Sequence, residues 1–367
     1  MSVKKNKMRG INPLSMNLVM TGAMLHGQEH AEMAMVKMIK GMQKYQASSF
    51  YPKAAQKKSV WQSGQSSLFE IKNVASNDKS PLVVLVPSLV NGAEIFDLYE
   101  DRSMCAWFSD EGFRTYLFDW GDLTKDDVTN CSALITGKLQ KALEHLKGEN
   151  PNAPIHVLGY CMGGTLCVGL VHNAPDLVSS LTLLASPWNY HIGAQTLLSR
   201  IKFWAPSALM QSEKKGALSA SSLQMLFASV DPLLTQRKFE KFLDMSDQEQ
   251  NFKLFVAVED WLNNGFDIPE NIAQECITQW YLKNVQHEKK WSVGGQNVDP
   301  QTIECPIHIV ASKKDRLVDY ESSMALAAQL NNAEALDPDC GHIGMIAGAQ
   351  SIENVWRPIA DWMRAKS

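Results

Sequence analysis

A short segment near the middle of the chain, residues 155–166, constrains the possible fold more than any other. Residues 155–158 form an apolar run typical of a buried strand, and the sequence Gly-Tyr-Cys-Met-Gly-Gly follows at once. The apolar run at 165–172 then predicts a helix, which Pro175 prevents from extending far. A strand, a tight turn and a helix with glycine on both sides of one residue form the pattern of a nucleophile elbow, here with Cys161 at the nucleophile's position.

The glycines of this segment have a steric explanation. The central residue of such a turn has a strained backbone, and side chains two positions before and after it would collide across the turn. Gly159 and Gly163 occupy those two positions. The alternative is an ordinary glycine-rich turn whose cysteine is merely small and buried. Other parts of the chain must decide between this turn and a nucleophile elbow.

Strands and helices alternate around this segment. The run between Pro81 and Pro87 is continuously apolar, as in a strand buried on both faces of a parallel sheet. Alternating elements of this kind predict an α/β protein with a doubly wound, mostly parallel sheet. The predicted strands are 59–61, 67–73, 82–87, 113–121, 155–158, 180–185, 307–311 and 334–336, and the helices flanking them are 103–111, 128–147, 320–330 and a closing helix that contains Pro358.

Two regions depart from the alternating pattern. Residues 14–46 are loosely helical and rich in methionine, which suits either packing into an irregular groove or binding an apolar partner surface. From about residue 188 to 299 the pattern predicts helices, among them 249–262 and one starting at 268–270, but no buried strand. We therefore expect an N-terminal helical segment and linker (1–58), a core in two parts (59–188 and 301–367) and an inserted helical cap (189–300).

Composition excludes several classes of function. With 367 residues and a formal net charge of −4, the chain gives no electrostatic reason to bind nucleic acid. Its seven scattered cysteines, without a Cys-x-x-Cys pair, argue against a disulfide framework or structural zinc and for a reducing cytoplasm. The N-terminal apolar residues are interrupted by polar ones, which fits neither a signal peptide nor a membrane span. No metal or nucleotide motif occurs, so no cofactor is expected.

A cysteine nucleophile needs a base and a group that orients the base. In the α/β-hydrolase topology the acid and the histidine follow the nucleophile along the chain, in loops after later strands. Asp315 comes soon after the strand at 307–311, and His342 lies in a glycine-flanked loop after the last strand. Asp337 and Asp339 compete with Asp315, because both lie close to His342 in the sequence. His156 and His308 fall within strands and are interpreted as core or edge residues.

The oxyanion of the reaction would need two backbone N–H donors. One is expected from Met162, directly after the nucleophile. The other should lie in the loop after the strand at 82–87, near Val90, by the same topological rule.

A cysteine at the nucleophile's position favours one class of substrate over another. A thiolate that attacks an oxygen ester must expel a poorer leaving group than itself, whereas attack on a thioester exchanges one thiol for another at little net cost. The enzyme thioester that results is stable enough to react with an alcohol instead of water. Cys161 therefore favours thioester substrates and acyl transfer over lipase chemistry.

At this point the sequence resembles the polyhydroxyalkanoate synthase family, whose lipase-like box has Cys in Gly-x-Cys-x-Gly-Gly. The segments 89–91, 96–103, 116–121 and 341–344 are also similar to family motifs, and the resemblance runs from about residue 80 to the C-terminus. The compact length is most like the short catalytic subunit of class III synthases. Two departures stand out: 92–94 lack the expected basic or aromatic residues, and Arg316 and Asp319 replace the His and Pro that often surround the catalytic Asp.

The resemblance implies an enzyme that polymerises 3-hydroxyacyl-CoA and releases coenzyme A. Cys161 would carry the acyl group as a thioester, His342 would activate Cys161, and Asp315 would assist His342 or the incoming hydroxyl. The implied partners are a polyester granule surface, a possible second synthase subunit and further copies of the chain. The alternatives are a cysteine-dependent thioesterase of the same fold and a non-catalytic granule-associated protein.

Overall fold

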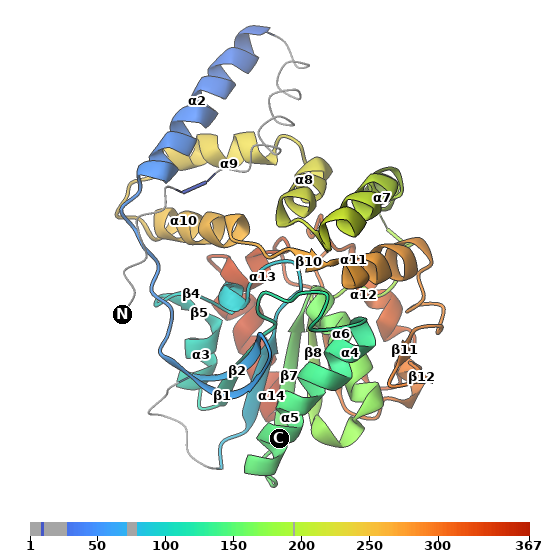
Figure 1. Ribbon diagram of the computed structural model, residues 1–367. Helices are drawn as coiled ribbons and strands as arrows, with labels where there is room; N and C mark the ends of the chain where they lie inside the picture. The colour runs from blue at the N-terminus through green and yellow to red at the C-terminus, as the bar shows by residue number, and fades with distance from the viewer. Residues whose placement is uncertain (1–8, 11–27, 72–78, 194) are drawn as a thin grey trace.

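An eight-stranded sheet forms the centre of the computed structural model, which describes residues 9–10, 28–71, 79–193 and 195–367 (Figure 1). The strand order is β1-β2-β6-β3-β7-β8-β13-β14; β1 and β2 run antiparallel to their neighbours and the other pairs are parallel. The predicted doubly wound, mostly parallel sheet is thereby confirmed. The strands are β1 (Lys57–Ser63), β2 (Ser66–Ile71), β3 (Leu82–Val86), β6 (Arg114–Asp119), β7 (Ile155–Tyr160), β8 (Ser180–Leu184), β13 (Ile307–Val310) and β14 (Ala333–Leu336).

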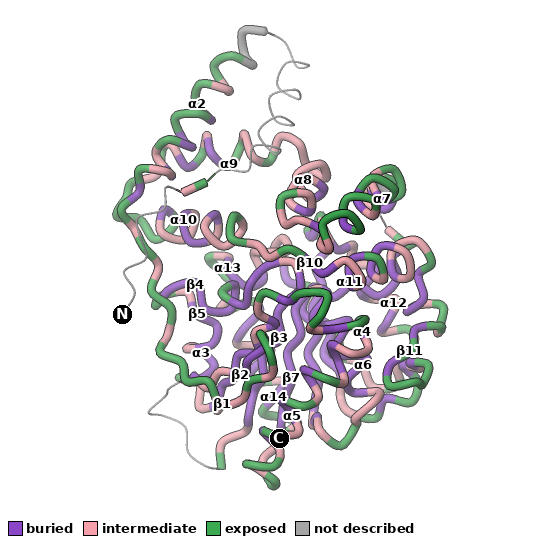
Figure 2. The backbone as a smooth tube through the Cα atoms, in the orientation of Figure 1, coloured by how far each residue is buried: buried purple, intermediate pink, exposed green. Residues whose placement is uncertain are grey.

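Helices cover both faces of this sheet, and each face has its own buried apolar cluster. Residues of β3, β7 and β8 contribute to both clusters, which explains why these strands are largely apolar and buried (Figure 2). One face packs against α4 (Cys131–Leu134), η2 (Ile135–Leu139), α5 (Gln140–Glu149), α6 (Met162–Asn173) and α12 (Tyr320–Ala327). The other face packs against α3 (Met104–Asp110), α13 (Gly344–Ala347), η6 (Ile352–Trp356) and α14 (Arg357–Arg364).

The chain between β8 and β13 is mostly helical and lies over one edge of the sheet in Figure 1. Its helices are α7 (Gln195–Lys215), α8 (Ala220–Val230), α9 (Leu234–Leu243), α10 (Gln250–Asn263), α11 (Glu270–Glu275) and η4 (Cys276–Leu282). Two short antiparallel pairs also occur there: β9 (Ala217–Leu218) with β10 (Ile268–Pro269), and β11 (Ser292–Val293) with β12 (Gln296–Asn297). The sequence predicted no buried strand here, and the strands that occur are each two residues long and pair outside the central sheet. The domain boundaries stay a prediction.

The methionine-rich helix α2 (Gln28–Ala47) packs against α9. Met38, Met42 and Tyr45 are buried in a small aromatic cluster with Phe239 and other residues of α9 and α10. The opposite side of α2 exposes large apolar side chains, namely Met33, Val36 and Ile39. Groove packing therefore accounts for one side of α2 only, and residues 14–27 of the predicted helix lie outside the described residues.

Several boundaries differ from the sequence prediction. Strand β7 continues to Tyr160, two residues beyond the predicted end. Pro269 precedes α11 and is not part of its first turn. It belongs to β10, where it pairs with Ala217 of β9. Pro358 lies in the first turn of α14, and the π-helical segment η6 leads into it. The remaining short elements are η1 (Ala93–Phe96), β4 (Asp97–Tyr99), β5 (Arg102–Ser103), η3 (Pro175–Leu177) and η5 (Pro300–Thr302).

Candidate active site

Cys161 occupies the sharp turn between β7 and α6. Its backbone has φ 53° and ψ −127°, a conformation that L-residues rarely adopt, and its N–H donates to the carbonyl oxygen of Leu184 at 2.9 Å. Met162 begins α6, so Cys161 sits at the positive end of that helix. Cys161 is also the partly buried residue that packs against both apolar clusters. The structure thus has the strained turn that the sequence predicted.

The two glycines beside Cys161 are required by close contacts. A Cβ atom on Gly159 would lie 2.5 Å from the Cα of Gly164, and one on Gly163 would lie 2.3 Å from the carbonyl oxygen of Pro87. Both distances are shorter than real Cβ contacts allow. A side chain at Gly159 would therefore collide with Gly164, and a side chain at Gly163 would collide with the loop after β3.

Replacing Gly163 by Ala is expected to destabilise the fold by about 1–3 kcal/mol, because the new methyl group overpacks against backbone that cannot move aside. Gly148, in α5, is the matched control, since a Cβ atom there meets nothing within 4 Å. Gly148→Ala should raise stability by up to about 1 kcal/mol through helix propensity. Urea unfolding followed by circular dichroism measures both changes, and equal effects at the two positions would contradict the steric account.

Asp315 and His342 meet as the sequence predicted. Asp315 follows β13, and its Oδ2 lies 2.7 Å from Nδ1 of His342. Its other oxygen, Oδ1, accepts the backbone N–H groups of Leu317 at 2.8 Å and Val318 at 3.0 Å. The carboxylate is therefore fixed from both sides, and only 1% of its side chain is exposed. With Nδ1 donating to Asp315, Nε2 of His342 is the ring nitrogen that can serve a substrate or nucleophile.

The two competing aspartates are bound elsewhere. Asp337 forms an ion pair with Lys313 at 2.9 Å, and Asp339 forms one with Lys314 at 2.6 Å. These pairs lie at the surface, whereas Asp315 is buried. Of the three carboxylates, Asp315 is the one placed on the His342 ring.

The environment of His342 favours its protonated form. Burial alone lowers the pKa of the imidazole, but the charge of Asp315, the neighbouring Cys161 and the hydrogen bonds to both residues outweigh burial and raise the pKa to about 10. The raised pKa depends on Cys161 as well as on Asp315, so these three side chains form one electrostatic unit. An imidazole that holds its proton this strongly is suited to keep the proton that it takes from a thiol.

Tyr160 is a neighbour of His342 that sequence reasoning missed. Its ring centroid lies 5.0 Å from that of His342, and its buried hydroxyl donates to the His342 carbonyl oxygen at 3.4 Å. Burial, with Cys161 and Asp315 nearby, raises the pKa of this phenol well above its usual value. The only signal for Tyr160 in the sequence is its position beside Cys161.

The predicted oxyanion donors are at the expected places. Met162 is the first residue of α6, where backbone N–H groups have no acceptor within the helix. Val90 follows β3 and lines the same cavity as Cys161, while its N–H makes a long bond of 3.4 Å to the Ser88 hydroxyl. Their role as an oxyanion hole stays a prediction.

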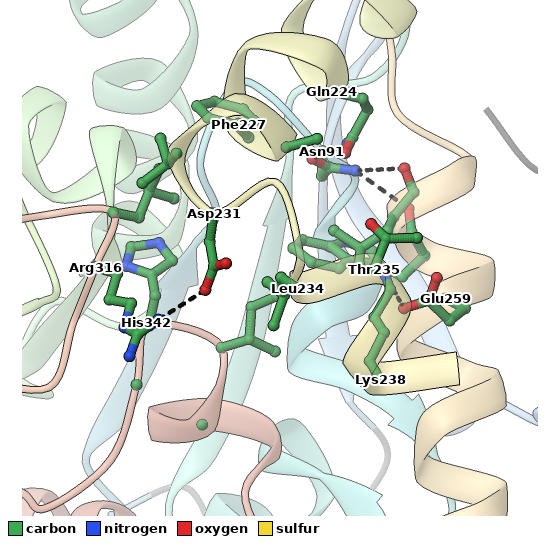
Figure 3. Close-up of a pocket in the computed structure, with 18 of the residues that line it drawn as sticks. Asn91, Gln224, Phe227, Asp231, Leu234, Thr235, Lys238, Glu259, Arg316 and His342 are labelled. Atoms are coloured by element: carbon green, nitrogen blue, oxygen red, sulfur yellow. Dashed lines mark hydrogen bonds and ion pairs between the residues drawn. The ribbon is translucent and has the colours of Figure 1, made fainter. Parts of the chain in front are cut away.

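Cys161 lines a cavity of about 660 Å³, and Figure 3 shows this cavity with His342 among the residues around it. Cys161, His342 and Val90 form its floor, at the carboxyl edge of the sheet. Helices α8, α9 and α10 form the opposite walls, through Phe227, Ala228, Val230, Leu234, Thr235, Lys238, Phe239, Glu259, Trp261, Leu262 and Asn263. The helical segment between β8 and β13 therefore encloses the candidate nucleophile.

Polar contacts tie this helical segment to the core. Asp231, between α8 and α9, accepts from Arg316 at 2.7 Å and from Arg237 at 2.6 Å, as Figure 3 shows for Arg316. Arg316 is one of the two departures from the family pattern around the Asp, and this contact gives it a structural role. On the other side, Trp261 donates its indole N–H to the carbonyl oxygen of Gly92 at 2.8 Å.

Two further histidines that the structure describes, His156 and His308, do not line this cavity. His156 is buried between the hydroxyls of Ser180 (2.7 Å) and Ser367 (2.9 Å), and His308 stacks on Trp362, so both are structural as predicted.

Among the residues that the structure describes, no group of three or more His, Cys, Asp or Glu side chains could hold a metal ion. Within the same ranges, no helix is both long and apolar enough to cross a membrane.

Cys161 is expected to be the first cysteine that iodoacetamide modifies at neutral pH. It lines the cavity, where a small reagent can reach it, together with His342. Burial raises the pKa of the Cys305 and Cys340 thiols to about 11 and that of the fully buried Cys105 and Cys167 also above the usual range. Peptide mass spectrometry after brief labelling measures the order, and faster labelling of Cys305 or Cys340 would contradict it.

Comparison with known proteins supports the resemblance. The chain is 25% identical to the poly(3-hydroxyalkanoate) polymerase subunit PhaC of Haloferax mediterranei over 291 residues, 78% of this chain and 59% of that protein. The subunit PhaC of Thiocystis violacea is 25% identical over 79% of this chain and 82% of its own length, and that of Synechocystis sp. is 26% identical over 84% of each. The chain thus spans about three fifths of the haloarchaeal relative and most of the other two.

A solved structure and a family model agree on the fold. The thermophilic esterase of Thermogutta terrifontis superposes with a TM-score of 0.53 at 14% identity, covering 85% of this chain and 99% of that one; this likeness concerns the fold alone. The model of the α/β-hydrolase fold family matches residues 81–349, from the start of β3 to beyond His342. Together with the strand order and the strained turn at Cys161, this match shows that the chain belongs to the α/β-hydrolase fold family.

Proposed function

We propose that this protein transfers 3-hydroxyacyl groups from coenzyme A thioesters to the end of a growing polyhydroxyalkanoate chain, with Cys161 carrying each group as a thioester. The observation that supports this most is the placement of Cys161 and His342 at the floor of one cavity, with Asp315 bound to the far side of the imidazole. The similarity to polymerase subunits over 78–84% of this chain supports the same assignment. Coenzyme A enters this scheme as part of the substrate, and no cofactor takes part.

In the first step, Nε2 of His342 holds the proton that it has taken from the Cys161 thiol, and Sγ of Cys161 attacks the thioester carbonyl. The oxyanion that forms accepts hydrogen bonds from the N–H groups of Met162 and Val90. The carbon–sulfur bond to coenzyme A then breaks, and His342 returns the proton to the departing thiolate. One thioester is exchanged for another, so the step requires no further reactant.

In the second step, the hydroxyl at the end of the polyester attacks the thioester on Cys161. His342 takes the hydroxyl proton and returns it to Sγ as the carbon–sulfur bond breaks. Asp315 keeps the imidazole oriented in both steps through its bond to Nδ1. A new ester bond forms and the free thiol of Cys161 is restored, which completes one cycle of chain growth.

The test is incubation of the purified protein with 3-hydroxyacyl-CoA donors, following free thiol and insoluble polyester together. We expect both products to appear. Soluble 3-hydroxy acid without polymer would instead identify a thioesterase, in which water discharges Cys161. Coenzyme A release that persists in Cys161→Ala would contradict the covalent mechanism in either form.

We also propose that the protein works in the cytoplasm at the surface of a polyester granule, as a homo-oligomer and together with a second synthase subunit. The relatives' designation as polymerase subunits supports a multi-subunit enzyme. Polymer formation by the protein alone, compared with the protein plus a candidate second subunit, tests this directly. An unchanged rate and an unchanged size in gel filtration would argue against such a partner.

A further inference from the structure

The cavity above Cys161 is much larger than a short hydroxyacyl group requires. A 3-hydroxybutyryl group has as many non-hydrogen atoms as benzene, which a cavity of about 150 Å³ accommodates. The cavity here measures about 660 Å³, and cavities of roughly 300–1,000 Å³ hold drug-sized ligands. A short acyl group alone therefore fills only part of this space, and the thioester end of the donor and the end of the polyester share the rest.

Apolar side chains line the same cavity as the candidate nucleophile. Phe227, Ala228 and Val230 of α8 contribute to this lining, together with Leu317 and Ile343 of the core. All five are only partly buried. Figure 3 shows Phe227 and Leu234 around the same space as His342. These walls gain the hydrophobic free energy of burial only when an apolar ligand covers them.

Several polar side chains of the cavity form ion pairs with one another or hydrogen bonds with nearby backbone. Lys238 and Glu259 form an ion pair at 2.6 Å, and Asp231 binds Arg316 at 2.7 Å. Asn91 donates to the carbonyl oxygen of Trp261, which lies on α10, at 3.2 Å. These side chains therefore do not depend on an acyl group for their hydrogen bonds, and the surface left for the acyl group is largely apolar.

We propose that the site prefers acyl groups longer than 3-hydroxybutyryl, with the alkyl chain lying along Phe227, Ala228, Val230 and Leu317. This inference rests on the proposed function and adds the class of acyl donor. Each methylene group that becomes fully buried against these walls is worth about a fourfold increase in kcat/KM. The preference follows from the apolar walls of the cavity, and its volume leaves room for the longer alkyl chain.

The experiment measures kcat/KM for coenzyme A release from 3-hydroxybutyryl-, 3-hydroxyhexanoyl-, 3-hydroxyoctanoyl- and 3-hydroxydecanoyl-CoA. We expect a rise of about sixteenfold from butyryl to hexanoyl, two methylenes longer, and a further rise to octanoyl. A maximum at butyryl, or equal values along the series, would overturn the preference while leaving the proposed function intact. Failure to release coenzyme A from any donor would overturn the proposed function itself.

Substitutions on α8 test whether the alkyl chain of the acyl group binds along this helix. Ala228→Phe fills the cavity and is expected to lower kcat/KM at least about tenfold for octanoyl, by the loss of two or more buried methylenes, with little change for butyryl. Met225→Phe is the matched control, because Met225 lies on the same helix but lines a different cavity, beside Phe203. Val230→Phe narrows the cavity independently should Ala228→Phe fold poorly. An equal loss for both donors in the two cavity-filling variants, or a similar loss in the control, would overturn the assignment.

Discussion

Cys161→Ala is expected to abolish acyl transfer, with a loss on the order of 10⁶-fold in kcat, as found for the nucleophile of an enzyme in which the triad acts as a unit. His342→Ala should cost a similar amount, because without the base the thiol proton has no acceptor. The double variant should be no worse than either single one, since each substitution already removes the covalent route. Coenzyme A release under saturating donor measures all three.

The control for this result is another partly buried cysteine. Cys305 lies just before β13, and it does not line the cavity that contains Cys161. Cys305→Ala should leave kcat within about twofold, as surface substitutions away from a site usually change little. Losses that multiply in the double variant would show that Cys161 and His342 act independently, contrary to the mechanism.

The order of residues along the chain predicted the centre of the site. Glycines beside Cys161 indicated a strained turn, because such a turn excludes Cβ atoms, and the structure has φ 53° there. A carboxylate after one late strand and a histidine after the next predicted their meeting, because the carboxyl ends of parallel strands lie at one edge of the sheet. The choice between Asp315 and its competitors needed the structure, since sequence distance alone favours Asp337 and Asp339.

The walls of the cavity could not be predicted in this way. Phe227 and Glu259 come from helices whose sequence pattern shows which side is apolar but not which neighbour it meets, and Asp231 lies between two such helices. Helix–helix packing depends on loops and on crossing angles that have no local signature. Asp231 is an example, since its contact with Arg316 joins residues 85 positions apart. The same holds for Tyr160, whose contact with the His342 carbonyl exists only in the folded chain.

Asp315→Asn is expected to lower kcat by about 10⁴-fold without disturbing the fold, the loss known for the equivalent change in a serine protease triad. The asparagine carbonyl can still accept the N–H groups of Leu317 and Val318, which places its NH₂ group toward Nδ1 of His342. Nδ1 must then accept a hydrogen bond, so the ring proton moves to Nε2 and the imidazole can no longer take a proton from Cys161. The defect thus lies in the tautomer rather than in stability.

The pKa of His342 provides a second readout for the same variant. Burial lowers this pKa, and Asp315 is the first of the groups that raise it to about 10. In Asp315→Asn the charge is gone while burial remains, so the imidazole should lose its proton at a lower pH than in the unchanged protein. Nitrogen NMR of labelled histidine follows this titration. Asp337→Asn is the control, because Asp337 pairs with Lys313 at the surface and its loss should shift neither kcat nor the His342 titration appreciably. If Asp337→Asn matched Asp315→Asn in both measurements, the carboxylate that orients His342 would have been misassigned.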